Sequence, residues 1–192
     1  MLTITLAHPD HAAALLAFES ENRLHFEQWI ASRGEHFYQL EQVHASLQQA
    51  QAAAHAGEPK EYHYLVWLGD EIVGRVALRG IEREHYFKAS IGYRFSGRHG
   101  GKGYASMAVN AVAESGFLNL GLQRIEAVVI MDNRPSQTIM RKCGFSQYGH
   151  SRASVLRHGQ WLDTLLFERH AGPASEATQQ SNPIAVLTPT PK

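Results

Sequence analysis

Three glycines and two basic side chains gather in one short segment, Arg98-His99-Gly100-Gly101-Lys102-Gly103-Tyr104-Ala105. Glycine tolerates backbone conformations in which successive N–H groups turn toward one point. A strongly periodic apolar stretch follows and predicts a helix, whose N-terminus adds a positive partial charge at the same place. The segment therefore predicts an anion site suited to phosphate, with formal charge from Arg98 and Lys102. A turn that only connects a strand to a helix is the alternative.

Residue spacing excludes two common phosphate-binding loops. A nucleoside-triphosphatase loop needs a glycine five residues before its Gly-Lys pair and a Ser or Thr after it. Here Ser96 occupies the first position, and Gly103 follows Lys102. A dinucleotide-binding fingerprint that starts at Gly101 needs another glycine at position 106, which is Ser106. The segment therefore fits neither of these two loop types.

A second polar group lies downstream, in the segment Asn133-Arg-Pro-Ser136-Gln-Thr-Ile139-Met140-Arg-Lys142-Cys-Gly144-Phe145. Pro135 suits the first turn of a short helix, and Gly144 ends it. Asn133 and Ser136 stand one turn apart. Their side chains either hydrogen-bond a ligand or cap the helix, and the pattern alone does not separate these two roles.

The two segments together resemble the GCN5-related N-acetyltransferase (GNAT) family. The family's loop pattern, Gln/Arg-x-x-Gly-x-Gly/Ala, is matched by Arg98, Gly101 and Gly103. The downstream segment is similar to the branch that acetylates the N-termini of ribosomal proteins. Three further stretches also look like that branch: Ile91-Gly92-Tyr93, Gly159-Gln-Trp161-Leu-Asp163, and residues 21–29. The resemblance spans about residues 1 to 170.

The resemblance implies a fold and a cofactor site. The fold is a mixed α/β (α+β) arrangement, in which helices flank a mostly antiparallel sheet with a strand–glycine loop–helix unit. Acetyl-CoA lies between the predicted strands 88–95 and 124–130, with its pyrophosphate on the loop and its thioester carbonyl on a backbone N–H near Ile91 to Tyr93. The implied cofactor-binding residues are Ile91, Gly92, Tyr93, Arg98, His99, Gly100, Gly101, Lys102, Gly103, Tyr104, Ala105, Asn133, Ser136 and Met140.

Acetyl transfer requires a deprotonated amine, a donor to the thioester oxygen, and a hydrogen bond or proton for the departing thiolate. The tyrosine that acts as general acid in several relatives falls at Met140, and the glutamate that many members carry before Ile-Gly-Tyr is Ser90. Ser136 is therefore the predicted thiol partner, beside Asn133. The base stays open among Glu126, Glu21, His25, a base reached through water, and an amine that arrives neutral.

Apolar periodicity predicts the elements that position these residues. Strands are expected at Leu2–Ala7, Tyr62–Leu68, Glu71–Ile81, Lys88–Phe95, Arg124–Ile130, Phe145–His150 and Gln160–Arg169. Helices are expected from Pro9 to about Asn22 with Asp10 as cap, over His36–His55, from Ala105 to Leu120, and over Ser136–Cys143. The β-branched run Arg124–Ile130 is typical of a strand covered on both faces.

Composition fits one globular domain over residues 1–170 and a tail over 171–192. The chain has 192 residues, of which 44% are hydrophobic, and its 18 basic and 18 acidic residues leave no net charge. We therefore expect no nucleic-acid partner, no membrane span, and no metal at His8-Pro-Asp10-His11. The single cysteine, Cys143, favours a reducing, cytoplasmic compartment and is expected to pack rather than react. The Pro- and Ser-rich residues 171–192 are expected to be dispensable for catalysis.

Three functions stay open on the sequence. The leading one is an acetyl-CoA-dependent N-acetyltransferase that acts on a protein N-terminal amine, as a monomer or homodimer. The second is an enzyme for a small amine, such as a polyamine, an amino acid or an antibiotic. The third is a non-catalytic acyl-CoA-binding module.

Overall fold

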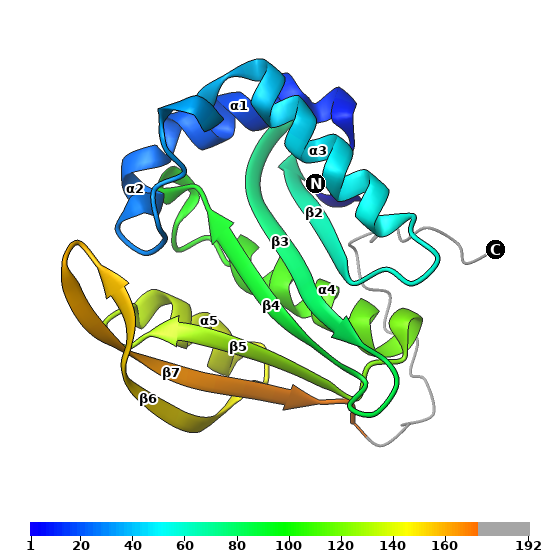
Figure 1. Cartoon of the computed structure of the whole chain (residues 1–192), viewed down its shortest axis with the longest axis vertical. Coiled ribbons are helices and arrows are strands. Elements are labelled where there is room, and N and C mark those ends of the chain that lie inside the picture. Colours follow the sequence, from blue (N-terminus) through cyan, green and yellow to red (C-terminus); the bar gives the residue numbers. More distant parts are fainter. Residues whose placement is uncertain (173–192) are drawn as a thin grey trace.

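A computed structural model of the chain describes residues 1–172 (Figure 1). Most of the predicted tail, residues 173–192, lies outside the described residues. In chain order the elements are β1 (Leu2–Leu6), η1 (Pro9–His11), α1 (Ala12–Glu21), α2 (Arg23–Glu27), η2 (Glu35–Tyr38), α3 (Leu40–Ala54), β2 (Glu61–Leu68), β3 (Glu71–Glu82), β4 (Lys88–Phe95), η3 (Gly97–His99), α4 (Tyr104–Leu120), β5 (Arg124–Ile130), α5 (Arg134–Lys142), β6 (Ser146–Arg157) and β7 (Gln160–His170), where η marks a short 3-10 helix.

The seven strands form one sheet in the order β1-β2-β3-β4-β5-β7-β6. Every neighbouring pair is antiparallel except β4 and β5, which are parallel. The expected mixed, mostly antiparallel sheet with flanking helices is confirmed. Among residues 1–172, no helix is long and apolar enough to cross a membrane.

Helices cover the sheet on both faces, so the molecule has two apolar cores (Figure 1). One core joins α4 and α5 to the sheet and includes Val76, Val112 and Phe167, each at most 1% exposed. Gly116 lets α4 approach β5, because a Cβ there would lie 3.0 Å from Cδ1 of Ile125. The second core joins α1, α2 and α3 to the opposite face near β2 and includes Leu15.

The structure corrects several expected boundaries. Residues 36–55 do not form one helix, because η2 ends at Tyr38 and α3 begins at Leu40. The side chain that caps η1 belongs to His8, whose Nδ1 accepts from the N–H of Asp10, so the expectation of Asp10 as cap is wrong. Strand β6 runs to Arg157, well past the expected end at His150.

Strand β5 is not covered on both faces, contrary to expectation. Its buried and accessible residues alternate, and Val128 is 63% exposed while Ala127 and Val129 are buried. The open face of β5 is the face on which a cavity lies, so its apolar surface is available to a ligand.

Candidate active site

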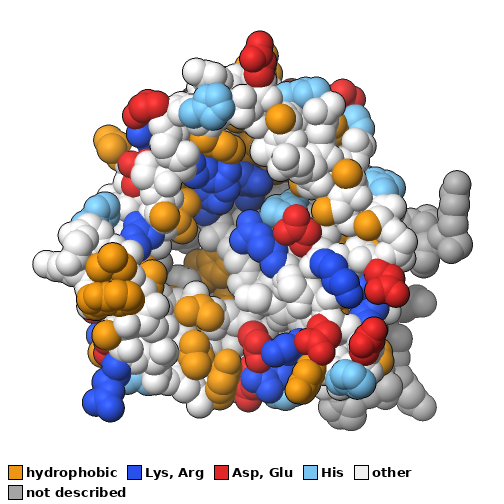
Figure 2. Space-filling view, viewed as in Figure 1, with side chains coloured by type: hydrophobic (Ala, Val, Ile, Leu, Met, Phe, Trp, Pro, Cys, Tyr) orange, Lys and Arg blue, Asp and Glu red, His pale blue; other side chains and the backbone are white. Residues whose placement is uncertain are grey.

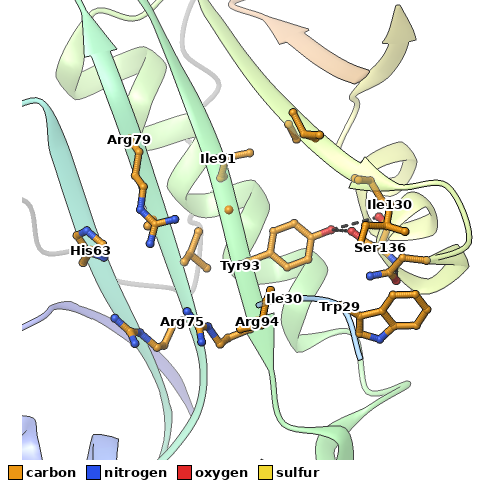
Figure 3. Close-up of a pocket in the computed structure, with 17 residues that line it drawn as sticks. Trp29, Ile30, His63, Arg75, Arg79, Ile91, Tyr93, Arg94, Ile130 and Ser136 are labelled. Carbon is orange, nitrogen blue, oxygen red and sulfur yellow. Dashed lines mark hydrogen bonds between the residues drawn. The ribbon is translucent and has the colours of Figure 1, made fainter. Parts of the chain in front are cut away.

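The sheet opens between β4 and β5. The two strands pair at only three positions, Lys88 with Arg124, Ala89 with Ile125 and Ser90 with Glu126. Beyond Ser90, β4 keeps its partner β3 on one side, so its other backbone edge is free to bind an extended ligand. The open ends enclose a cavity of about 230 Å³ (Figure 3). Its lining consists of Trp29, Ile30, His63, Arg75, Val76, Ala77, Arg79, Ile91, Gly92, Tyr93, Arg94, Ala127, Val128, Val129, Ile130, Asn133 and Ser136.

The predicted site residues Ile91, Gly92, Tyr93, Asn133 and Ser136 are brought together in this lining. The Tyr93 ring reaches from β4 across the gap to the first turn of α5 (Figure 3). Its hydroxyl lies 2.8 Å from Oγ of Ser136, and it donates to the backbone oxygen of Ser136 at 3.1 Å. Burial raises the pKa of Tyr93 above its ordinary value of 10, so the phenol stays protonated at neutral pH.

Asn133 and Ser136 have different local roles. Asn133 is the N-cap of α5, because its Oδ1 accepts from the backbone N–H of Ser136 at 3.1 Å. The Ser136 hydroxyl takes no part in that cap and instead meets Tyr93. Helix capping therefore accounts for an asparagine at position 133, whereas the Ser136 hydroxyl remains available for a ligand in the cavity.

The glycine loop has the geometry of an open anion site. Gly101 and Gly103 have φ values of +76° and +83°, and a Cβ at either would meet nothing within 4 Å. The Met107 N–H makes the first backbone bond of α4, to the oxygen of Gly103. The N–H groups of the preceding three residues therefore have no intrahelical acceptor, and they lie at the positive end of a 17-residue helix.

The two cations of the loop differ in their partners. Arg98 forms an ion pair with Glu71 and approaches Glu21 at 3.7 Å. His99 points its Nε2 at the same Glu71, 3.3 Å away. Lys102 is exposed and has no carboxylate within 4 Å in residues 1–172, so its charge is the less compensated one.

Some predicted residues do not reach the cavity. Glu126 is held by Arg124 at 2.6 Å and Lys88 at 3.7 Å, in the closed part of the β4–β5 pair. Met140 is fully buried in the core beside α4 and does not line the cavity. Glu21 and His25 also lie outside the lining, since they stand near Arg98 and Gly97.

Sequence reasoning missed a group of basic side chains in the same lining. Arg75, Arg79 and Arg94 face the cavity, together with His63 (Figure 3). These residues are scattered over three strands, and only the antiparallel register places them side by side. The space-filling view shows blue side chains gathered in the central hollow of this face (Figure 2).

Two carboxylates, Glu19 and Glu61, contact the basic side chains of the cavity. Glu19 of α1 is completely buried, and its two carboxylate oxygens accept from Arg75 at 2.6 Å and from Arg94 at 3.2 Å. Burial lowers the pKa of Arg94 to about 9, although Glu19 opposes that shift. Burial also lowers the pKa of His63, in spite of its contact with Glu61 at 3.2 Å, so this imidazole is neutral at pH 7 and able to accept a proton.

The wall of the cavity beside Trp29 and Ile30 is fixed by the β6–β7 hairpin. The Arg157 guanidinium donates to the backbone oxygen of Glu27 at 2.9 Å and also to that of Ile30. Glu27 and Trp29 belong to the stretch 21–29 that carries the family resemblance, whereas Ile30 and Arg157 belong to no predicted motif. The hydrogen bonds join segments more than 120 positions apart in the chain.

In the described residues, no group of three or more His, Cys, Asp and Glu side chains is arranged to hold a metal ion. Cys143 is buried in the core, and burial raises the pKa of its thiol to about 11.

A parallel strand pair that opens beside a glycine loop and a helix N-terminus defines an acyltransferase-type site, and comparison with known proteins gives the family. Residues 1–146 match the family described as Acetyltransferase (GNAT) domain, and the chain belongs to this family. It is 35% identical over 150 residues to the "Probable N-acetyltransferase YjcK" of Bacillus subtilis, a match that covers 77% of this chain and 82% of that protein.

Solved structures share the fold. A ribosomal-protein-S5-alanine acetyltransferase from Vibrio fischeri aligns with a TM-score of 0.81 and 24% identity, over 87% of this chain and 91% of that one. Mycobacterium smegmatis RimJ, solved in complex with CoA-disulfide, aligns with the same TM-score and identity, over 93% and 84%. At this identity the two structures show that the folds agree.

Proposed function

We propose that this chain transfers the acetyl group of acetyl-CoA to the α-amine of a protein N-terminus. The observation that carries the proposal is the opening between β4 and β5, which has a free strand edge and two hydroxyls in its lining. The glycine loop follows β4 in the chain, which supports its inclusion in the same site. The N-terminal acceptor is supported by the sequence motifs and by the named activity of the Vibrio fischeri structural relative.

The residues present fit acetyl-CoA. The loop at Gly101 and Gly103 offers open space, unpaired N–H groups and the charge of Lys102, which suit a pyrophosphate. The free edge of β4 from Ile91 onward suits the amide-bearing arm of the cofactor, because it can supply backbone hydrogen bonds. When bound there, acetyl-CoA would supply the thioester that an amine attacks.

Three steps of chemistry fall to the residues of the cavity. A backbone N–H near Ile91 to Tyr93 would polarise the thioester carbonyl. His63 is held neutral and would take the ammonium proton through water, which leaves the amine free to form the new C–N bond. As the C–S bond breaks, Ser136 would donate a hydrogen bond to the thiolate, and the Tyr93 hydroxyl would turn its single proton from the backbone oxygen of Ser136 to Oγ of Ser136. The thiolate would then take the proton that the new amide nitrogen loses.

The test is acetylation of a panel of amines, with thiol release and product mass as readouts. Short peptides with a free α-amine should be acetylated at that amine, whereas peptides with a blocked N-terminus should not react. Acetylation of polyamines or antibiotics but not of peptides would replace the acceptor with a small amine. Binding of acetyl-CoA without release of thiol to any amine would identify a non-catalytic acyl-CoA-binding module.

A further inference from the structure

The floor of the cavity carries more positive charge than its own carboxylates balance. Arg75, Ala77 and Arg79 are every second residue of β3, so their side chains lie on the same face of the strand. Arg94 is the register partner of Arg75 on β4. Glu19 is shared by Arg75 and Arg94.

Two more charged side chains, Arg33 and Glu61, lie near these arginines. Arg33 interacts electrostatically with Glu19, Arg75 and Arg79, and it packs over the Phe37 ring at 4.2 Å. Glu61 lies beside His63 and is the register partner of Arg79. Three guanidinium groups in the cavity lining, those of Arg75, Arg79 and Arg94, and the nearby Arg33 outside the lining thus share two carboxylates, Glu19 and Glu61. Within residues 1–172, neither Arg33 nor Arg79 has a carboxylate within 4 Å.

Arg79 is the member of this group that is free to meet a ligand at the reaction centre. It is accessible to solvent in the cavity, and its guanidinium lies over Gly92, because a Cβ on Gly92 would be 3.6 Å from Nη1 of Arg79. Gly92 belongs to the short stretch at which we place the thioester. An anion held by Arg79 would therefore lie close to the attacking amine.

Arg79 has no carboxylate within 4 Å in residues 1–172, and its neighbour Arg75 already shares Glu19 with Arg94. Partial burial lowers the pKa of Arg79, and the neighbouring Arg75 charge lowers it further. Burial also lowers the pKa of Arg33, while Glu19 opposes that shift and the charges of Arg75 and Arg79 add to it. A bound anion would relieve this repulsion and would gain charge-assisted hydrogen bonds from a planar guanidinium.

We propose that the cavity selects acceptors that carry an anionic group within one or two residues of the reactive amine, and that Arg79 binds that group. The proposal rests on the proposed acetyl transfer and gives its substrate class. The shared chemistry is an amine with a nearby carboxylate. The carboxylate has two sources, an acidic side chain near a protein N-terminus and the α-carboxylate of a free amino acid.

The experiment compares short, C-terminally amidated peptides that begin with alanine and differ only at the second residue, which is Asp, Asn or Lys. The wild-type protein should acetylate the Asp peptide with a kcat/KM about 10- to 100-fold above that of the Asn peptide, the gain of a charge-assisted hydrogen bond. The Lys peptide should be poorest. Free alanine forms a separate arm, in which the α-carboxylate is the only anion.

Variants of Arg79 test whether the preference for the Asp peptide over the Asn peptide comes from the cavity. In Arg79→Gln the ratio of the Asp to the Asn peptide should fall toward one, and Arg79→Lys should keep part of it. The matched control is Arg83→Gln, because the Arg83 guanidinium donates to the backbone oxygen of Pro59 and lies outside the cavity lining. That variant should keep the full ratio.

The outcomes separate this inference from the proposed function. Equal acetylation of the Asp and Asn peptides, or a preference that survives Arg79→Gln, overturns the inference and leaves acetyl transfer intact. Arg79-dependent acetylation of free alanine alone supports the anion site and overturns the protein acceptor. If no acceptor reacts, the proposed function fails, and calorimetry with the same peptides decides the anion site: a preference for Asp that Arg79→Gln removes supports it, and no preference overturns it.

Discussion

The contact between Tyr93 and Ser136 is the part of the site most open to a quantitative test. We predict that Ser136→Ala slows turnover because the hydroxyl assists departure of the thiolate. The Ser136 hydroxyl is not needed for the helix cap, which Asn133 provides. Its loss should therefore leave the backbone of α5 and the affinity for acetyl-CoA nearly unchanged.

The expected size follows from the hydrogen bonds. A hydrogen bond to a charged group contributes roughly 1.5–3 kcal/mol, which corresponds to a rate loss of about 10- to 100-fold if the bond forms only as charge develops on sulfur. Loss of the neutral contact to Tyr93, 2.8 Å long, should lower the free energy of unfolding by only about 1 kcal/mol.

The assay combines turnover, cofactor affinity and melting temperature for Ser136→Ala, Tyr93→Phe and the double variant. If the two hydroxyls act as one unit, the double variant should be about as slow as Ser136→Ala alone. Thr138→Val is the control, because Thr138 lies on the exposed side of the same helix and its hydroxyl only bonds the oxygen of Arg134. It should turn over normally.

Two results would refute this reasoning. Normal turnover per folded molecule in Ser136→Ala, with a lowered melting temperature, would make the hydroxyl purely structural. Rate losses in Tyr93→Phe and Ser136→Ala that add fully in the double variant would show that the two hydroxyls act independently.

Three further predictions concern the loop, the buried carboxylate and the imidazole. Gly103→Asp should weaken acetyl-CoA binding at least about tenfold in calorimetry, because the new carboxylate would face the pyrophosphate. The control Gly103→Ala has the same φ of +83° without the charge and should bind acetyl-CoA better than the Asp variant does. Equal affinities of the two variants would refute the placement of the pyrophosphate on the loop. Glu19→Gln should lower the free energy of unfolding, measured by urea denaturation, by about 3–5 kcal/mol, since it leaves buried arginines without their partner. The exposed Glu41→Gln is the control. An equal loss of stability in both variants would contradict the role of Glu19. Because the pKa of His63 is lowered, the unfolded chain binds more protons than the folded one just below pH 6.5, and stability falls as the pH drops through that window. His63→Gln should flatten this part of the pH–stability curve, and an unchanged slope would contradict the cause.

Local patterns in the sequence predicted most elements that build the site. The periodic stretch from Ala105 to Leu120 and the glycines before it correspond to α4 and its loop. The predicted strands Tyr62–Leu68 and Glu71–Ile81 correspond to β2 and β3. These features depend on neighbours in the chain, so the sequence alone reveals them.

The elements that were missed depend on distant contacts. Strand β6 has register irregularities between Gln147 and Gly149 and between Ser151 and Val155, so its later half shows no alternating pattern. Val128 is exposed because its side chain lies on the face of β5 that lines the open cavity. Nothing in the residues around Val128 distinguishes an open strand from a covered one.

The residues of the site also divide into those set by neighbours in the chain and those set by distant contacts. The cap at Asn133 and the loop glycines come from contiguous motifs. The contact of Tyr93 with Ser136 spans 43 positions, and the link from Arg75 to Glu19 spans 56. Sequence spacing carries no signal for contacts of this kind, because only the strand register and the docking of α1 and α5 create them.

The central claim is that this site transfers acetyl to an α-amine, and tandem mass spectrometry of one reaction tests it most directly. The protein is incubated with acetyl-CoA and a peptide that carries both a free α-amine and an internal lysine, and thiol release is followed in parallel. We predict one acetyl group on the α-amine for each thiol released, with the lysine unmodified. Thiol release without a peptide product, acetyl on the lysine alone, or no reaction despite bound acetyl-CoA would contradict the claim.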